Sequence, residues 1–149
     1  IGSPGSRPAI EAAARRAAAV LVLEPPLADD GLKTARKGIG RFRLDVAGVA
    51  AHAGVEPEKG ASAVVELAHQ VLAITRLADP ATGTTLNVGR VEGGTTPNVV
   101  AAQAWADVDV RVATAAEAAR VESALRALRP VDPRTTLDVS GRFNRPPME

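Results

Sequence analysis

Four side chains in this chain of 149 residues belong to types that bind and polarise anionic substrates. His52 stands among alanines and glycines, Asn98 ends a glycine-rich turn, and Arg111 lies in a segment of alternating apolar and polar residues. Glu24 follows a short apolar run. A guanidinium group binds a carboxylate through two hydrogen bonds, and a histidine or an amide steadies the oxyanion that forms when an amide carbonyl is attacked. Together these groups could hold an anionic substrate.

Each of these residues also has an ordinary structural explanation. The loop around His52 needs glycine and carries one polar residue, Asn98 favours turns, and Arg111 suits a solvated sheet face. The sequence shows no attacking group: it has no Ser-His-acid arrangement, no His-Glu-x-x-His motif and no phosphate-cradling glycine loop at a strand-to-helix step. The chain alone is therefore not expected to hydrolyse a substrate.

The composition argues against several classes of protein. A net charge of +1 and an aromatic content of 2% do not suit a nucleic-acid binder, which needs basic patches and stacking rings. The sequence has no cysteine, so it forms no disulfide and no thiolate metal site. No apolar run approaches the roughly 20 residues of a membrane helix. We expect no nucleic acid or membrane as a partner, and a cytoplasmic location.

From Gly38 onward, apolar residues follow strand and helix periodicities in turn. Phe42, Leu44 and Val46 alternate with charged residues, as in a half-buried strand. The order β-α-β-β-α-β is typical of a ferredoxin-like α+β sandwich, in which two helices cover one face of a four-stranded antiparallel sheet. The expected strands are 42–46, 84–91, 99–112 and 135–139, and the expected helices are 61–77 and the segment that follows Thr114.

Both helices of this sandwich are expected to be amphipathic. The apolar face of the first contains Val64, Val65, Ala68, Val71, Leu72 and Thr75. That of the second contains Ala118, Val121, Leu125 and Leu128. Before the sandwich, we expect a helix over 6–19 that is capped by Ser6, and a short buried strand over 20–23.

Four motifs follow one another along the second part of the chain: Gly48-x-x-Ala51-His52-Ala53-Gly54, Pro57 with Gly60-Ala61, Gly93-Gly94-x-x-Pro97-Asn98-Val99-Val100 and Asp107-Val108-Asp109-Val110-Arg111. In order and spacing they resemble the lid, or dimerisation, domain of the zinc-dependent aminoacylase and glutamate carboxypeptidase family, and most closely its bacterial glutamate carboxypeptidase branch. Nearer the start of the chain, Glu24-Pro25 resembles the metal-binding glutamate segment of the family, and the stretch 1–7 resembles the one that follows its catalytic acidic pair.

The resemblance implies a hydrolase with two zinc ions in a separate catalytic domain, where a glutamate base activates the bridging water. By similarity, Glu24 would be a zinc ligand. His52 would enter the active site of the partner subunit and polarise the scissile carbonyl.

The resemblance also implies which residues bind the substrate, a small acidic amide or peptide. Asn98 and Arg111 would contact it, with Arg111 on its terminal carboxylate. Arg145 is a further carboxylate-binding candidate, and Lys33 is a weaker one because the segment around it aligns loosely. Related branches of the family cleave N-acyl, N-carbamoyl or N-succinyl amino acids, and the sequence does not separate these substrates.

The same resemblance predicts how the chain is divided. Residues 1–37 would be a remnant of the zinc-binding catalytic domain, 38–141 the lid, and 142–149 the start of the return to the catalytic domain. Glu24 alone cannot hold catalytic zinc, so we expect the isolated chain to be inactive and to bind no metal.

Lid domains of this family pair through an edge strand and a helix, so we expect a symmetric homodimer. A second hypothesis is a ferredoxin-like regulatory or dimerisation module that binds a small ligand and catalyses nothing. The segment at Glu24 distinguishes the two, because a regulatory module has no use for it.

Overall fold

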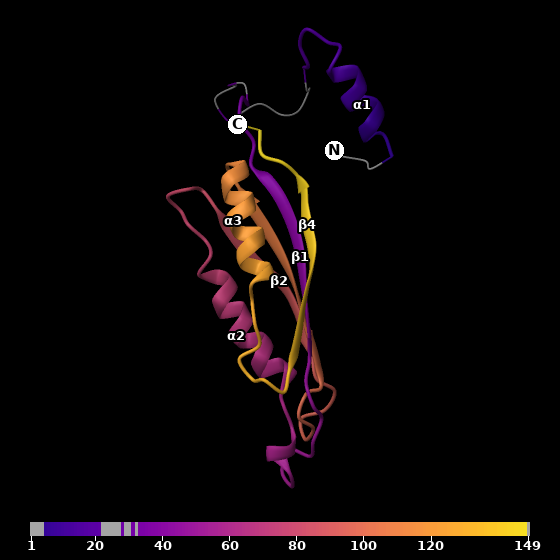
Figure 1. The fold of residues 1–149 in the computed structure, drawn as a ribbon, viewed down its shortest axis with the longest axis vertical. Helices are drawn as coiled ribbons and strands as arrows, with labels where there is room; N and C mark the ends of the chain where they lie inside the picture. The colour runs from indigo at the N-terminus through magenta and orange to yellow at the C-terminus, as the bar shows by residue number, and fades with distance from the viewer. Residues whose placement is uncertain (1–4, 22–27, 29–30, 32, 149) are drawn as a thin grey trace. The chain divides into compact units, whose positions relative to one another are not determined.

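The structure is a computed structural model that describes residues 5–21, 28, 31 and 33–148 (Figure 1). The chain forms two compact units, Ile1–Lys33 and Thr34–Glu149. None of the described helices is long and apolar enough to cross a membrane. The predicted assignment of 1–37 and 142–149 to a catalytic domain stays a prediction.

The first unit contains α1 (Arg7–Ala14), which is shorter than the helix expected over 6–19. Pro8 lies in its first turn, but the Ser6 side chain does not make the capping hydrogen bond that we expected. Val20 and Leu21 belong to no helix or strand, and the rest of the strand expected over 20–23 lies outside the described residues.

The second unit has the predicted order of elements. Its elements are β1 (Gly38–Ala47), a 3₁₀ turn η1 (Pro57–Lys59), α2 (Ala63–Thr75), β2 (Thr85–Gly93), β3 (Gln103–Val112), α3 (Ala115–Arg126) and β4 (Thr136–Arg145). The sheet has the strand order β2-β3-β1-β4, and every neighbouring pair is antiparallel. Both helices cover one face of this sheet: α2 packs on β1, β2 and β3, and α3 packs on β1, β3 and β4 (Figure 1).

The core lies between the sheet and the two helices, and strand alternation builds it. Phe42, Leu44 and Val46 of β1 point to the helices together with the even-numbered residues 104–112 of β3. Leu67 from α2 and Leu125 from α3 are fully buried on this layer. The opposite face of the sheet carries no helix, and we call it the open face. On β1 and β3 the odd-numbered side chains lie on this face, and most of them are polar or charged, as the alternation predicted.

The predicted packing face of α3 is confirmed, but that of α2 is wrong. In α2 the buried residues are Ala63, Glu66, Leu67, Gln70 and Ile74. Apolar side chains surround this helix, so periodicity alone could not choose its packing face. Of the face that we expected to be buried, Val71 packs on the core, whereas Val64, Val65, Ala68, Leu72 and Thr75 are exposed.

Glu66 is buried because it holds the connection between α3 and β4. Its carboxylate accepts hydrogen bonds from the backbone N–H groups of Val131, at 3.0 Å, and Asp132, at 2.9 Å. Gln70 donates to the same carboxylate at 2.7 Å, and also to the carbonyl oxygen of Arg129. Burial raises the pKa of Glu66, but these hydrogen bonds outweigh burial and hold the pKa below its usual value.

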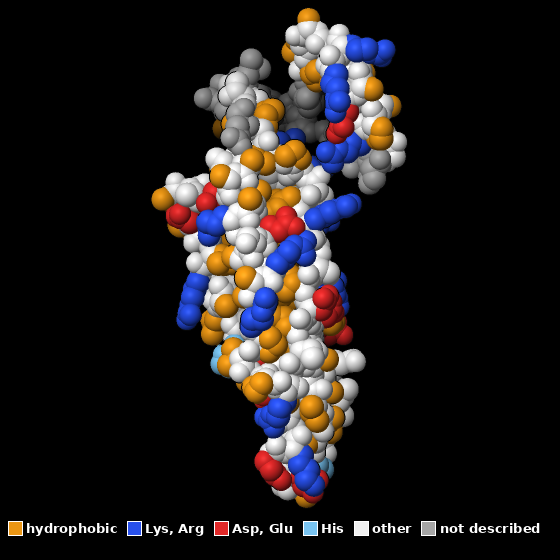
Figure 2. Space-filling view, in the orientation of Figure 1, with side chains coloured by type: hydrophobic (Ala, Val, Ile, Leu, Met, Phe, Trp, Pro, Cys, Tyr) orange, Lys and Arg blue, Asp and Glu red, His pale blue; other side chains and the backbone are white. Residues whose placement is uncertain are grey.

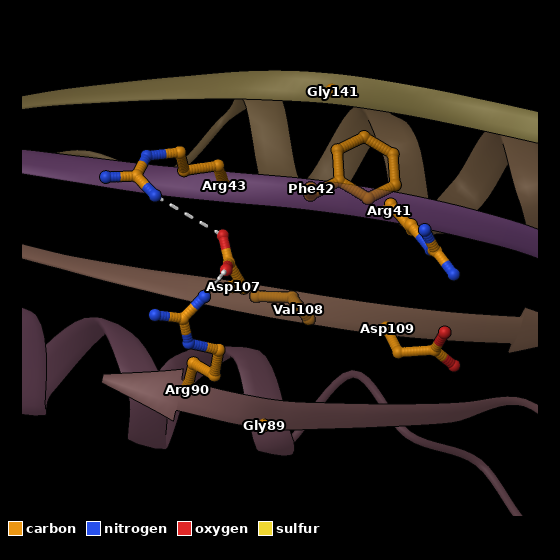
Figure 3. Close-up of a pocket in the computed structure, with 9 residues that line it drawn as sticks. All are labelled: Arg41, Phe42, Arg43, Gly89, Arg90, Asp107, Val108, Asp109 and Gly141. Atoms are coloured by element: carbon orange, nitrogen blue, oxygen red, sulfur yellow. Dashed lines mark ion pairs between the residues drawn. The ribbon is translucent and has the colours of Figure 1, made fainter. Parts of the chain in front are cut away.

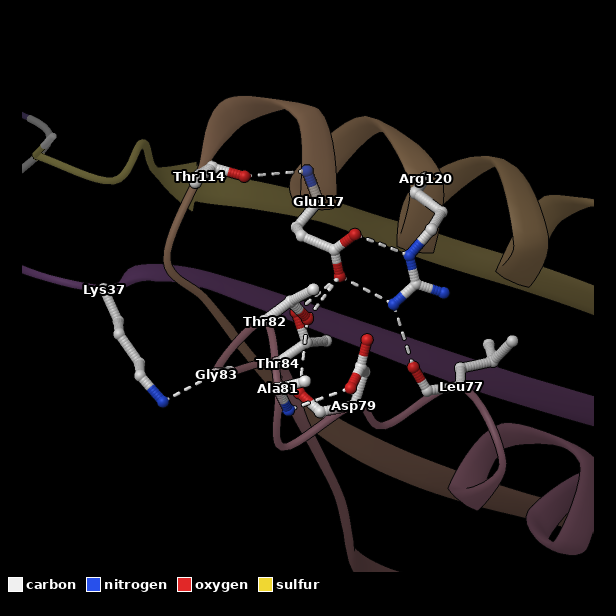
Figure 4. A network of polar contacts seen from close by, with 10 residues as sticks. All are labelled: Lys37, Leu77, Asp79, Ala81, Thr82, Gly83, Thr84, Thr114, Glu117 and Arg120. Carbon is white, nitrogen blue, oxygen red and sulfur yellow. Dashed lines mark hydrogen bonds and ion pairs between the residues drawn. The ribbon is translucent and has the colours of Figure 1, made fainter.

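Glu117 ties the start of β2 to α3 (Figure 4). Its carboxylate accepts hydrogen bonds from the hydroxyls of Thr84, at 2.6 Å, and Thr82, at 3.1 Å. Arg120 donates two more, at 2.8 and 2.7 Å, and also reaches the carbonyl oxygen of Leu77. The hydrogen bonds from Arg120 and then from Thr84 lower the pKa of Glu117 to about 2. The hydroxyl of Thr114 caps α3 by accepting a hydrogen bond from the backbone N–H of Glu117.

We predict that Glu66→Ala lowers the free energy of unfolding by about 2–3 kcal/mol, because the N–H groups of Val131 and Asp132 lose their acceptor and Gln70 loses its buried partner. Urea unfolding at neutral pH measures this loss. The control is Glu58→Ala, which removes an exposed carboxylate from η1. Equal stability of the two variants would show that Glu66 does not hold the connection.

We predict that Glu117→Gln destabilises the fold in a pH-dependent way. A carboxylate with a depressed folded pKa stabilises fully above its unfolded value of about 4.5, and loses this contribution as the pH falls through about 2. The difference in unfolding free energy between the wild type and the variant should therefore be largest above pH 4.5 and vanish toward pH 2. A constant difference across this range in urea titrations would contradict the assignment. Glu92→Gln, at an exposed position of β2, is the control.

Candidate functional site

The structure brings the loops of His52 and Asn98 together at one end of the sheet. His52 forms a β-bridge with Val99, and the backbone N–H of Ala53 donates to the carbonyl oxygen of Asn98 at 3.0 Å. The expected strand over 99–112 begins only at Gln103, because the residues before it pair with the His52 loop. Figure 2 shows charged side chains gathered at this tip of the unit, around η1.

Glycines allow the two loops to pack this closely. A Cβ on Gly48 would collide with the backbone of Ala61, and one on Gly60 would lie 2.8 Å from the side chain of Val100. Val49 and Ala61 exchange both backbone hydrogen bonds at 2.9 Å, which closes the base of the loop. Close backbone packing and these hydrogen bonds therefore fix the conformation of the His52 loop.

Hydrogen bonds orient both candidate side chains. The Nδ1 atom of His52 accepts a hydrogen bond from the backbone N–H of Gly54 at 3.2 Å, so the neutral ring carries its proton on Nε2. The Oδ1 atom of Asn98 accepts a hydrogen bond from the hydroxyl of Thr96 at 2.5 Å, which leaves the amide NH₂ as a donor. Both side chains are exposed. The tip thus offers two N–H donors, as a developing oxyanion requires.

Arg111 lies near the opposite end of β3. It lies eight positions after Gln103, which corresponds to about 27 Å along a strand. Its Nε and Nη2 atoms bind both carboxylate oxygens of Asp109, at 2.6 and 3.1 Å, and this hydrogen bonding raises the pKa of Arg111. Within one chain, the structure therefore does not bring Arg111 to His52 and Asn98.

Of the other candidates, Arg145 lies at the same end of the sheet as Arg111, and Lys33 lies in the first unit. Ile39 pairs with Arg111 on one side and with Arg145 on the other, so the two arginines lie at the same end of the open face. Lys33 is exposed and belongs to the first unit. Glu24 lies outside the described residues.

The residues that the structure describes do not fit a zinc site, since they contain no group of three or more His, Asp or Glu side chains that could hold a metal ion. The zinc ions that the family resemblance implies would therefore need ligands from outside the described residues.

A second polar cluster on the open face was not singled out from the sequence (Figure 3). The guanidinium carbons of Arg43 and Arg90 lie 4.2 and 4.9 Å from the ring centroid of Trp105. Asp107 pairs with both arginines, at 3.5 and 3.9 Å. The alternating charges along the strands were visible in the sequence, but only the register places these four residues together.

The strand order and the two helices on one face define a ferredoxin-like α+β module. A family described as the peptidase dimerisation domain, M20, matches residues 34–134, and this chain belongs to that family.

Similar proteins agree with this assignment. Carboxypeptidase G2 from a Pseudomonas species is 36% identical over 113 residues, which cover 75% of this chain and 27% of that protein. A probable carboxypeptidase from Aspergillus terreus is 42% identical over 107 residues, or 64% of this chain and 24% of that protein. The chain thus spans about a quarter of the length of these relatives.

Solved structures show the same fold. An aminobenzoyl-glutamate utilization protein from Klebsiella pneumoniae has a TM-score of 0.62 and 26% identity, covering 73% of this chain and 28% of that one. The aminopeptidase PepT from Bacillus cereus has a TM-score of 0.61 and 27% identity, covering 78% and 32%.

Proposed function

We propose that this chain is the dimerisation and substrate-binding part of a zinc-dependent metallopeptidase or amidohydrolase that hydrolyses the amide bond of N-acyl or peptidyl amino acids. The observation that carries this proposal is the pair of donors, His52 and Asn98, which lie together at one tip of a peptidase dimerisation domain. The names of the relatives, a carboxypeptidase and an aminopeptidase among them, support amide hydrolysis by the longer protein. Zinc would be bound in other parts of that protein, and the chain alone would be inactive.

We propose that the chain forms a symmetric homodimer through α2 and the edge of β2. The α2 face that turns away from the core exposes Val64, Val65 and Leu72, whose exposed fractions are 42%, 57% and 58%. Val91 on β2 is 59% exposed, and α2 packs against this strand. An apolar helix face beside an open strand edge is the combination that extends a sheet across a two-fold axis.

The other edge of the sheet is less suited to such pairing. Arg126 of α3 donates to the carbonyl oxygens of Gly141, at 3.0 Å, and Val139, at 3.5 Å, both on β4. A partner strand would have to displace this guanidinium group. Gly141 has a φ of 106°, and the register shifts between Ile39 and Gly40, so the ladder of β4 is irregular. These features favour β2 as the pairing edge.

The distance within the chain supports an active site shared between two subunits. A dipeptide-sized substrate spans only about 7 Å, whereas Arg111 lies about 27 Å along the strand from the end that carries His52 and Asn98. One copy of the chain therefore cannot place all three side chains on one substrate. We propose that each site takes His52 and Asn98 from one subunit and Arg111, with Arg145, from the other.

In this arrangement, the Nε2–H of His52 donates a hydrogen bond to the scissile carbonyl oxygen and steadies the negative charge that develops there. The amide of Asn98 is the second donor. Arg111 binds the terminal carboxylate of the substrate, which must share or displace the carboxylate of Asp109. Lys33 and Glu24 keep the proposed roles of substrate contact and zinc ligand.

We predict that Leu72→Glu converts the dimer of this chain into a monomer, because a charge on the apolar face of α2 would be buried without a partner. Light scattering after size exclusion measures the mass, and the monomer is 15.3 kDa. Ala119→Glu, at an exposed position of α3, is the control and should leave the dimer intact. A wild-type monomer at high concentration would refute the proposed interface.

We predict that His52→Ala lowers kcat of the longer protein by about 100-fold, as the loss of an oxyanion donor does, and that Ser123→Ala, at an exposed position of α3, has no effect. Mixing His52→Ala and Arg111→Gln subunits tests sharing. If the two residues come from different subunits, each hybrid dimer contains one intact site, and an equal mixture regains about a quarter of the wild-type activity. No recovery would mean that both residues serve the same subunit.

A further inference from the structure

Two neighbouring cross-strand rows on the open face are strongly basic. In the first row, Ile39 of β1 pairs with Arg111 and Arg145. In the second, Arg41 of β1 pairs with Asp109 and Arg142. On β2, the rows end in uncharged residues, Thr85 and Asn87. The two rows therefore hold four guanidinium groups and one carboxylate.

The single carboxylate does not neutralise Arg41. Asp109 lies directly across from Arg41, but both of its oxygens are bound by Arg111. Figure 3 shows the guanidinium group of Arg41 beside Asp109 with no ion pair between them. Within the described part of the chain, neither Arg41 nor Arg142 forms an ion pair.

Arg41 and Arg142 are thus like charges at directly opposed positions of an antiparallel pair. Side chains at such positions have Cβ atoms only about 5 Å apart, and like charges there destabilise the sheet. An anion between the two guanidinium groups would remove this repulsion, and each group would donate hydrogen bonds to it.

The surface beside this pair is hollowed. A cavity of about 450 Å³ on the open face is lined by Arg41, and Gly141, the residue before Arg142, lies at its margin (Figure 3). The acids in its wall are each matched by a guanidinium group: Asp107 by Arg43 and Arg90, and Asp109 by Arg111. Arg41 is the one arginine of the wall that is left without an acidic partner among the residues described.

We propose that Arg41 and Arg142 form an anion-binding clamp that takes the phosphate or carboxylate group of a small ligand at the edge of this cavity. The clamp is separate from Arg111, whose Nε and Nη2 donors are engaged by Asp109. It is a property of this chain, and it stands whether or not the longer protein hydrolyses amides.

Titrations of the chain with inorganic phosphate and with acetate, against sodium chloride at equal ionic strength, test the clamp. Trp105 is a suitable reporter, because the chain has one tryptophan and no tyrosine, and because Arg43 and Arg90, which contact its ring, line the same cavity. Saturable binding of phosphate, acetate or both supports the clamp and identifies the group that it takes. If phosphate and acetate each change the fluorescence of Trp105 no more than sodium chloride does, the clamp is overturned.

Arg41→Gln and Arg142→Gln should each weaken anion binding about tenfold, equivalent to about 1.4 kcal/mol. Arg76→Gln, which removes an equal charge from the end of α2, should have no effect. In phosphate-free buffer of low ionic strength, Arg41→Gln should raise the melting temperature, because it removes the like-charge repulsion.

Three results would contradict the clamp. Equal weakening by all three substitutions would mean that the anion responds only to net charge. A lower melting temperature of Arg41→Gln without phosphate would mean that Arg41 has another partner. The third result is that Arg41→Gln and Arg142→Gln leave anion binding unchanged but weaken the association of this chain with the rest of the longer protein. That result would mean that the pair binds an acidic protein surface instead.

Discussion

The register of β1 between β3 and β4 decides which side chains face the helices and which face outward. A slip of one residue would turn Phe42, Leu44 and Val46 to the open face and bring charged residues into the core. The buried alternating residues of β3 lock the same register from the other side. The same register decides which arginines and aspartates stand opposite one another on the open face. The packing of the core therefore also fixes the charge pattern on the open face.

Two carboxylates add directional hydrogen bonds to the apolar packing that holds the helices on this sheet. Glu66 on α2 binds the backbone that leads into β4, and Glu117 on α3 binds the turn that leads into β2. Each therefore joins a helix to a connection distant in sequence. These contacts hold the connections that lead into β2 and β4, the two edge strands of the sheet.

The two edges are unequal. Beside β2 lies an apolar face of α2 that has no partner in the described chain, whereas Arg126 covers part of β4. The length of β3 separates the loops of His52 and Asn98 from Arg111. The residues that the family resemblance assigns to one active site therefore lie at opposite ends of this strand, and the proposed dimer is the arrangement that would bring them together.

The sequence alone predicted the order of elements, the ferredoxin-like class and the family, because alternation, glycine turns and the motif around His52 are local patterns. It did not determine the packing face of α2, since apolar residues such as Val65 and Leu67 surround that helix and only contact with the sheet selects between them. It gave no sign that Glu66 would be buried, because the backbone groups that bind it lie 65 and 66 residues further along the chain. Tertiary structure also decided which arginines have partners. Arg41, Arg111 and Arg142 look alike in the sequence. The register places Arg41 opposite both Asp109 and Arg142, and the side-chain hydrogen bonds of the folded sheet join Asp109 to Arg111 instead.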